Sequence, residues 1–199
     1  MSEIQFDDLC DARLPQILSR AIERCLSDLQ YLQVIDIGCG DGLQISLLRE
    51  YNCFKYFLGF DVIDKANFEF RNCWDSVTCL NKTSSFREMN YEVWDIRNSP
   101  PFQLPKADLI ILSNVLHFLS PSRAREVLEI AKSVLKPSGL LYISVIASTR
   151  SSEVEFEIED KFQWVGSKDL LTHQMAGLSV LDLVENENTV QCIAVKGMV

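Results

Sequence analysis

The sequence contains no apolar run that approaches the roughly 18 residues needed to cross a bilayer. The first residues, MSEIQFDDLCDAR, are acidic and include no apolar segment, so we expect no secretory signal. None of the seven cysteines forms a C-x-x-C pair, and without a signal they are typical of reduced cytosolic thiols. These absences predict a soluble, cytoplasmic protein with no membrane segment.

Histidine and basic residues are also scarce. Only His117 and His173 are present, and no metal-ligand spacing surrounds them, so we expect no metal. The 19 Lys and Arg residues are outnumbered by 28 Asp and Glu, which gives a net charge of −9. Because an acidic surface repels phosphate backbones, a nucleic-acid partner is disfavoured. What is present is a 199-residue chain that is 47% hydrophobic, enough for one globular domain with a core.

Hydrophobic periodicity predicts an α/β arrangement. Apolar residues at helical spacing predict helices at 13–29, 43–51, from about Asp64, 120–135 and 167–177, while 71–90 reads as part helix and part loop. Short apolar runs predict strands at 32–37, 57–62, 91–96, 107–115 and 140–147, and two further runs around ENEN predict a terminal hairpin. This alternation predicts a mostly parallel sheet with helices on both faces. Ligands of such sheets bind at the carboxyl ends of the strands.

The stretch VIDIGCGDG, residues 34–42, places three glycines at alternate positions after the first apolar strand. Glycine allows a sharp turn and lets the backbone approach a ligand closely. A phosphate loop would need Lys followed by Ser or Thr, but Leu43 and Gln44 follow here, and the third glycine comes one place too early for a dinucleotide fingerprint. The leading Asp36 would repel a pyrophosphate, so it favours a ligand with a positive charge, such as an amine or a sulfonium.

With this motif the chain resembles the class I S-adenosylmethionine-dependent methyltransferases, over residues from about 30 to the C-terminus. The resemblance implies a three-layer α/β/α Rossmann-like sandwich, with a mostly parallel seven-stranded sheet and an antiparallel C-terminal hairpin. It also implies a single methyltransferase domain over 1–199, in which 1–30 form a helical cover and 31–199 the cofactor-binding core. S-adenosylmethionine would be the cofactor, S-adenosylhomocysteine the product, and no metal would take part.

The family's later motifs follow in order. Asp61, which closes FLGFDV, matches the acid that holds the ribose hydroxyls, although it could instead cap a helix. Asp95 in WDI matches the acid that takes the adenine amino group, although it could be a solvated loop acid. LSNVLHFL (112–119) matches the segment beneath the methionine part, and LKPSGLLYISV (135–145) matches the fifth strand. The implied cofactor-binding residues are Asp36, Gly38, Cys39, Gly40, Gly42, Asp61, Val62, Asp95, Ile96, Ser113 and Asn114; Cys39 could equally be a small space-filler.

The implied reaction is direct displacement of the methyl group, for which the protein mainly aligns two partners. His117, just past the fourth strand, is the best candidate for a general base, although it could simply form part of the pocket wall. His173 is expected at the surface. Phe118, Trp74, Trp94 and Trp164 could line an acceptor pocket or belong to the core. The acidic segment 147–166 reads equally well as a lid or as a solvated loop.

Several acceptor classes are not supported by the residues present. Ser113 and Asn114 stand where enzymes that methylate DNA bases or glutamine usually carry N-P-P-Y or D-P-P-Y. The end of the fourth strand also lacks an Asp with a following Asp-Asn, so a metal-dependent catechol-type site is not supported. We therefore expect a small-molecule acceptor, with no motif to specify whether oxygen, nitrogen or carbon is methylated. The alternatives are a protein or, less favoured, an RNA acceptor, and a non-catalytic protein that binds the cofactor as a regulatory or interaction partner.

Overall fold

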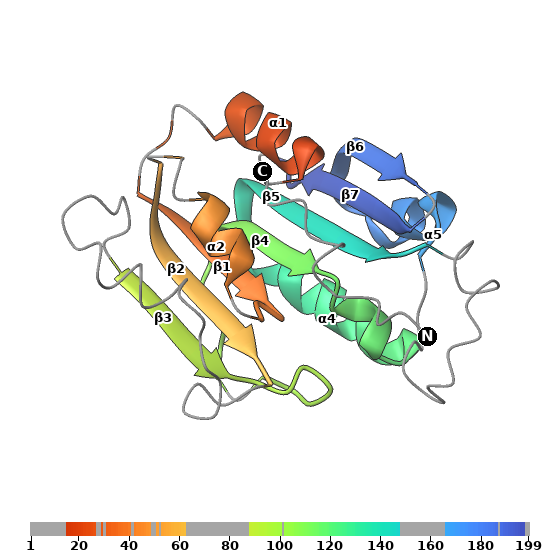
Figure 1. Ribbon diagram of the computed structural model, residues 1–199, viewed down its shortest axis with the longest axis horizontal. Helices are drawn as coiled ribbons and strands as arrows, with labels where there is room; N and C mark the ends of the chain where they lie inside the picture. Colours follow the sequence, from red (N-terminus) through yellow and green to blue (C-terminus); the bar gives the residue numbers. More distant parts are fainter. Residues whose placement is uncertain are drawn as a thin grey trace, which may run out of the picture.

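The computed structural model describes residues 15–26, 29, 31–40, 42–48, 51, 53–62, 88–100, 102–147, 166–186 and 188–197. Its centre is a seven-stranded sheet in the order β3-β2-β1-β4-β5-β7-β6 (Figure 1). The strands are β1 Leu32–Ile37, β2 Phe54–Asp61, β3 Glu88–Val93, β4 Ala107–Ser113, β5 Leu135–Ile146, β6 Ser179–Glu185 and β7 Thr189–Val195. Strands β1 to β5 pair in parallel, and β7 pairs antiparallel with both β5 and β6. The predicted mostly parallel sheet with a terminal hairpin is confirmed.

Helices cover both faces of the sheet. On one face, α1 (Gln16–Cys25) and α2 (Leu43–Leu48) pack with the apolar side chains of a first core cluster; α1 lies over β5, β7 and β6 (Figure 1). On the other face, α4 (Pro121–Val134) and α5 (Lys168–Gln174) bury their apolar sides in a second cluster. Ser120 caps α4, since its hydroxyl accepts from the Arg123 amide at 3.3 Å.

The third strand differs from its predicted range of 91–96. It runs from Glu88 to Val93, so the WDI segment lies in the connection after it. The strand pairs along the length of β2, from Tyr56 opposite Glu88 to Asp61 opposite Val93. Because β3 is an edge strand, it can carry exposed polar residues, and a search for apolar runs does not recognise such residues as part of a strand. Trp94 follows the strand and packs in the core, with its ring edge-on to Phe60 and the ring centroids 5.6 Å apart. Its apolar side chain therefore reflects core packing and not membership of β3.

Other boundaries shift for local reasons. Strand β2 begins at Phe54 rather than 57, and β4 ends at Ser113 because Asn114 takes a φ of 53° and leads into the short 3-10 helix η3 (Leu116–Phe118). Strand β5 begins at Leu135, not 140, with a bulge over KPSG: Ala107 pairs with Leu135, and Leu109 with Leu140. Helices α1, α2 and α5 are shorter than predicted. The helix expected near Asp64, Trp74, Trp164 and most of 147–166 lie outside the described residues.

The strand order reverses between β1 and β4. From β1 the chain adds β2 and β3 on one side, and then returns to add β4 and β5 on the other (Figure 1). At such a point the connections diverge to opposite faces, which leaves a crevice outside the carboxyl ends of the strands. The glycine motif, Asp61 and Ser113 are at or directly after the carboxyl ends of β1, β2 and β4, so the topology brings them together.

Candidate functional site

The glycine motif forms a tight loop at the end of β1. Gly38, Gly40 and Gly42 have φ angles of 78°, 51° and 84°, a region that side chains disfavour. A Cβ on Gly38 would lie 2.4 Å from Cγ2 of Val115, so glycine is also required there for close packing. A Cβ on Gly40 would meet no atom of the described residues within 4 Å, so the backbone at Gly40 can be approached from this side. The loop therefore combines one packed glycine with one that a ligand could approach.

Asp61, at the end of β2, is joined to this loop. Its Oδ2 accepts a hydrogen bond of 2.8 Å from the backbone amide of Gly40. The carbonyl of Phe60, one residue earlier, accepts from the amides of Gly38 and Cys39 at 2.7 and 3.0 Å. These contacts place the carboxylate beside the glycine loop. The helix that Asp61 could instead cap lies outside the described residues.

Asp36 is the most unusual side chain of the site. It is 1% exposed, and neither carboxylate oxygen has a hydrogen-bond partner among the residues that the structure describes. Burial first, and then the nearby charge of Asp61, raise the pKa of Asp36 to about 8. Buried polar groups are rarely left without partners, so this carboxyl group requires a reason. A cationic ligand group beside it would provide both a partner and a countercharge.

Asp95 lies in a turn after β3, where it forms an ion pair. Its two oxygens accept from Nε and Nη2 of Arg97 at 2.8 to 3.1 Å, from the Arg97 amide, and from the Asn98 side chain at 3.3 Å. Hydrogen bonding to Arg97 lowers the pKa of Asp95. The acid is paired with an exposed arginine, and its own side chain is 29% exposed in this turn. A carboxylate offers about four lone-pair sites, so a ligand amino group would have to displace one of these donors.

Two apolar residues of the expected cofactor site, Val62 and Ile96, differ in exposure. Val62, directly after Asp61, is 55% exposed and is available for contact. Ile96 is 9% exposed and belongs to the core cluster of the α4 face. Cys39 is also buried, and its Sγ would lie 2.9 Å from a Cβ on Gly59, so the thiol fills the space that this glycine leaves.

The segment after β4 forms the other side of the crevice. The Asn114 amide donates to the Ser144 carbonyl at 2.9 Å, and the Ser144 hydroxyl donates to Asn114 Oδ1 at 3.1 Å. These bonds hold the positive-φ residue at the end of β4. His117 in η3 is 3% exposed, its ring lies 4.3 Å from that of Phe118, and burial lowers its pKa to about 4. His173 is exposed in α5, as predicted.

A family model described as "Methyltransferase domain" matches residues 10–179. The chain belongs to this methyltransferase family. Its sheet order and terminal hairpin are those of the class I S-adenosylmethionine-dependent fold, which its structural neighbours share. The resemblance inferred from the glycine motif and the motifs after it is confirmed.

Similar proteins support the family and the fold. O-methyltransferase 12 of Dictyostelium discoideum is 29% identical over 128 residues, which are 64% of this chain and 31% of that protein. An S-adenosylmethionine-dependent methyltransferase from Clostridium acetobutylicum has a TM-score of 0.68 at 14% identity, over 91% of this chain and 89% of that one. The N-methyltransferase NodS of Bradyrhizobium japonicum, in complex with S-adenosyl-l-homocysteine, has a TM-score of 0.63 at 16% identity, over 89% and 84%. The chain thus spans about a third of its curated relative.

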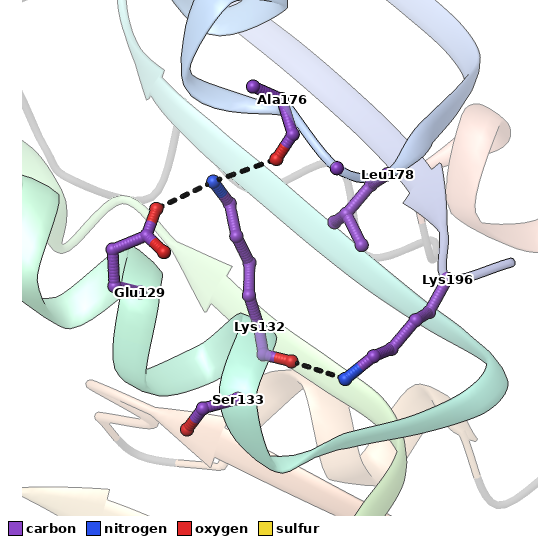
Figure 2. A pocket seen from close by; sticks show the side chains of 7 residues that line it. Glu129, Lys132, Ser133, Ala176, Leu178 and Lys196 are labelled. Atoms are coloured by element: carbon purple, nitrogen blue, oxygen red, sulfur yellow. Dashed lines mark hydrogen bonds and ion pairs between the residues drawn. The ribbon is translucent and has the colours of Figure 1, made fainter. Parts of the chain in front are cut away.

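A hollow lies near the C-terminal end of α4, at the amino end of β5. It encloses about 250 Å³ between the end of α4, the turn before β6 and Lys196 (Figure 2). Lys196 donates to the carbonyls of Lys132 and Leu135 at 2.8 and 2.9 Å, and Lys132 donates to Glu129 and to the Ala176 carbonyl. The Lys196 ammonium therefore satisfies carbonyls at the end of α4, and the Lys132 ammonium satisfies a carbonyl after α5, an arrangement that favours a structural role.

Among the described residues, no three His, Cys, Asp or Glu side chains gather as metal ligands would. None of the described helices is long and apolar enough to span a membrane.

Several residues of the site were missed by sequence reasoning. Val115 packs against Gly38, Ser144 holds Asn114, and Arg97 engages Asp95. Gln44, in the first turn of α2, has a buried Oε1 with no partner among the described residues. Only Arg97 carried a local signal, since a cation two residues from an acid can pair with it; the others depend on contacts between distant segments.

Proposed function

We propose that this chain is an S-adenosylmethionine-dependent methyltransferase that transfers a methyl group to a small-molecule acceptor by direct displacement, in the cytoplasm. The observation that carries the proposal is the pair of carboxylates at the strand-order reversal. Asp61 is bonded to the Gly40 amide, and Asp36 is buried beside the same loop with no hydrogen-bond partner among the described residues. Together they offer an acceptor pair for sugar hydroxyls and a countercharge for a cation, at one end of one loop.

The residues present fit the cofactor. We assign Asp61 to the ribose hydroxyls, because a carboxylate can accept from both at once. Asp36 would face the positive charge of the methionine part, while Gly38, Cys39, Gly40 and Gly42 let the backbone approach. We assign the adenine to Val62, Asp95 and Ile96, and the space beneath the methionine part to Ser113 and Asn114. When bound, S-adenosylmethionine supplies a methyl group already activated on sulfonium sulfur. The chain's task is to align it and exclude water.

The net charge of the chain and its similarity to an O-methyltransferase both favour a small acceptor over a macromolecule. The net charge of −9 opposes RNA binding, and the curated relative is named an O-methyltransferase. A protein acceptor would need to be basic to suit this surface. The non-catalytic alternative predicts a damaged glycine loop or a lost ribose acid, whereas the Gly40–Asp61 hydrogen bond is intact.

Calorimetric titration of the purified protein with S-adenosylmethionine and S-adenosylhomocysteine tests the proposal. We expect dissociation constants of about micromolar order, equivalent to roughly 8 kcal/mol of binding free energy. Circular dichroism of the same sample controls for folding. A folded protein that binds neither ligand at 1 mM, roughly 4 kcal/mol on the same scale, would overturn the cofactor assignment. Binding followed by methyl transfer to phenols, amines or carbon acids in a radiolabel screen would then separate an enzyme from a cofactor-binding regulator.

We further propose His117 as the general base for acceptors that hold a proton at neutral pH. Because burial lowers its pKa to about 4, the imidazole is neutral above about pH 5, which is the form that a general base requires, and its low basicity limits the rate gain that it can give. We expect His117→Gln to lower kcat by roughly 10²-fold or more, with the cofactor dissociation constant unchanged. The acidic limb of the wild-type pH–rate profile should fall near pH 4 and disappear in the variant.

The matched control is His173→Gln, which removes the exposed histidine of α5. It should leave kcat within about two-fold of the wild type, because surface substitutions rarely have large effects. If His117→Gln instead raises the cofactor dissociation constant and leaves kcat intact, His117 is part of the cofactor pocket wall and not the base.

A further inference from the structure

The turn that contains Asp95 is hydrogen-bonded to the first turn of α4 through Arg123. Arg123 has a side chain that is only 13% exposed. Its Nε donates to the Ile96 carbonyl at 2.7 Å, and its Nη2 donates to the Asn98 carbonyl. Its remaining terminal nitrogen, Nη1, pairs with Glu126 one turn along the helix at 2.6 Å. One guanidinium thus bridges two carbonyls that lie one and three residues after Asp95.

The same turn is closed by contacts of its own. The Asn98 amide donates to the Asp95 carbonyl at 2.9 Å, and the Trp94 indole nitrogen donates to the Asn98 carbonyl at 3.1 Å. Trp94 is held in turn by Phe60, in the strand that ends at Asp61. Arg123 adds hydrogen bonds to α4, beside the apolar packing of Ile96 in the core cluster of the α4 face.

Arg123 is itself placed by the cap of α4. Its amide donates to the hydroxyl of Ser120, directly after the segment that contains Asn114 and His117. The planar guanidinium presents its donors in a rigid fork, so its two carbonyl partners are fixed in relative position as well as in distance. The arrangement joins the two sides of the crevice, one after β3 and one after β4.

We propose that Arg123 is a positioning residue for adenine recognition: by holding the Ile96 and Asn98 carbonyls it sets the direction of the Asp95 carboxylate. The inference rests on the proposed function, since it takes Asp95 as the group that reads the adenine amino group. Arg97, which also holds Asp95, is 69% exposed and can yield to a ligand at little cost. Arg123 is only 13% exposed and is held by two carbonyls, so it preserves the geometry during that exchange.

A purely structural role for Arg123 makes a different prediction. Its loss leaves the carbonyl of buried Ile96 without its charged donor, which lowers thermal stability whether or not adenine is read there. Stability alone therefore cannot decide. The discriminating quantity is the ratio of affinities for two ligands that differ at the 6-position of the purine.

The experiment measures dissociation constants of S-adenosylhomocysteine and S-inosylhomocysteine, in which an oxo group replaces the amino group. We expect the wild type to prefer the adenine ligand by about ten-fold or more, as a hydrogen bond to a charged group implies. Arg123→Met should reduce that preference to about three-fold or less. Arg123→Lys, whose single ammonium can hold one carbonyl well, should retain an intermediate preference. Arg125→Met, an exposed arginine of the same helix, should behave as the wild type.

The possible outcomes distinguish a failure of the proposed function from a failure of the role assigned to Arg123. A wild type that binds neither ligand defeats the proposed function, and this inference with it. A wild type that binds both equally defeats the inference alone. If Arg123→Met melts at a lower temperature but keeps the full preference, Arg123 is only structural. Should Arg123→Met fail to fold, Arg123→Lys decides: a preference as large as the wild type's overturns the proposal, and a reduced one supports it.

Discussion

Replacing Asp61 with alanine is expected to weaken binding of S-adenosylmethionine and S-adenosylhomocysteine by about 100-fold or more, measured by calorimetric titration. Two contributions are lost together. Hydrogen bonds to a charged group contribute about 1.5–3 kcal/mol each, and we assign two to the ribose hydroxyls. The Gly40 amide also loses its acceptor, so the glycine loop loses a contact that holds it against β2. At 1.4 kcal/mol per factor of ten, the hydroxyls alone account for the expected loss.

Two further variants separate these contributions. Asp61→Asn keeps an oxygen that can accept from the Gly40 amide but loses the charge, so we expect an intermediate loss of roughly ten-fold. Glu129→Ala removes an exposed acid near the C-terminal end of α4 and should bind the cofactor as the wild type does. If Asp61→Ala binds within three-fold of the wild type while folded, Asp61 does not hold the ribose.

The parts of the site that sequence reasoning located correctly are those encoded by neighbouring residues. The turn after β1 needs positive φ at alternate positions, and only glycine meets that need repeatedly, so the motif itself shows where the loop lies. Asp61 could be placed because a short apolar strand ends directly before it. In both cases the chemical requirement and the residues that satisfy it are adjacent in the chain, where periodicity and turn chemistry can be read.

The parts that were missed depend on contacts between distant segments. The edge strand β3 presents Glu88, Asn90 and Glu92 to solvent, so its pattern did not reveal its start. Arg123 reaches carbonyls 25 and 27 residues earlier, which a helical pattern in α4 cannot indicate. The burial of Asp36 is likewise a property of the assembled sheet. The motif indicated that this acid could pair with a cation, but not that its carboxyl would have no hydrogen-bond partner in the described part of the chain.

Asp36 should make the stability of the cofactor-free protein fall as pH rises through neutrality. The pKa of Asp36 is about 8 in the folded chain, against 3.8 for an unperturbed aspartate. Between pH 3.8 and about pH 8 the folded state therefore holds a proton that the unfolded state has lost. The free energy of unfolding then decreases with pH, by at most about 1.4 kcal/mol per unit. From pH 6.5 to 8 we expect a decrease of about 2 kcal/mol, measured by urea denaturation.

The interval from pH 6.5 to 8 isolates this group. His117 has a lowered pKa of about 4, so below its unperturbed value of 6.5 it adds stability as pH rises and opposes Asp36. Burial raises the pKa of Cys192 to about 12, so this thiol stays protonated in the folded state throughout the interval. Asp36→Asn carries no proton to lose, and its unfolding free energy should stay nearly flat where that of the wild type declines.

The same variant connects stability to cofactor binding. A cationic group beside Asp36 favours the ionised carboxylate, so affinity of the wild type for S-adenosylmethionine should rise several-fold between pH 6.5 and 8. Asp36→Asn should bind about ten-fold or more weakly at pH 8 and lose this rise. A rise shared by S-adenosylhomocysteine would assign the ammonium group as the partner of Asp36, and a rise with S-adenosylmethionine alone would assign the sulfonium. Equal pH dependence of unfolding in wild type and variant would show that Asp36 is already ionised at neutral pH, and that its burial does not select a cation.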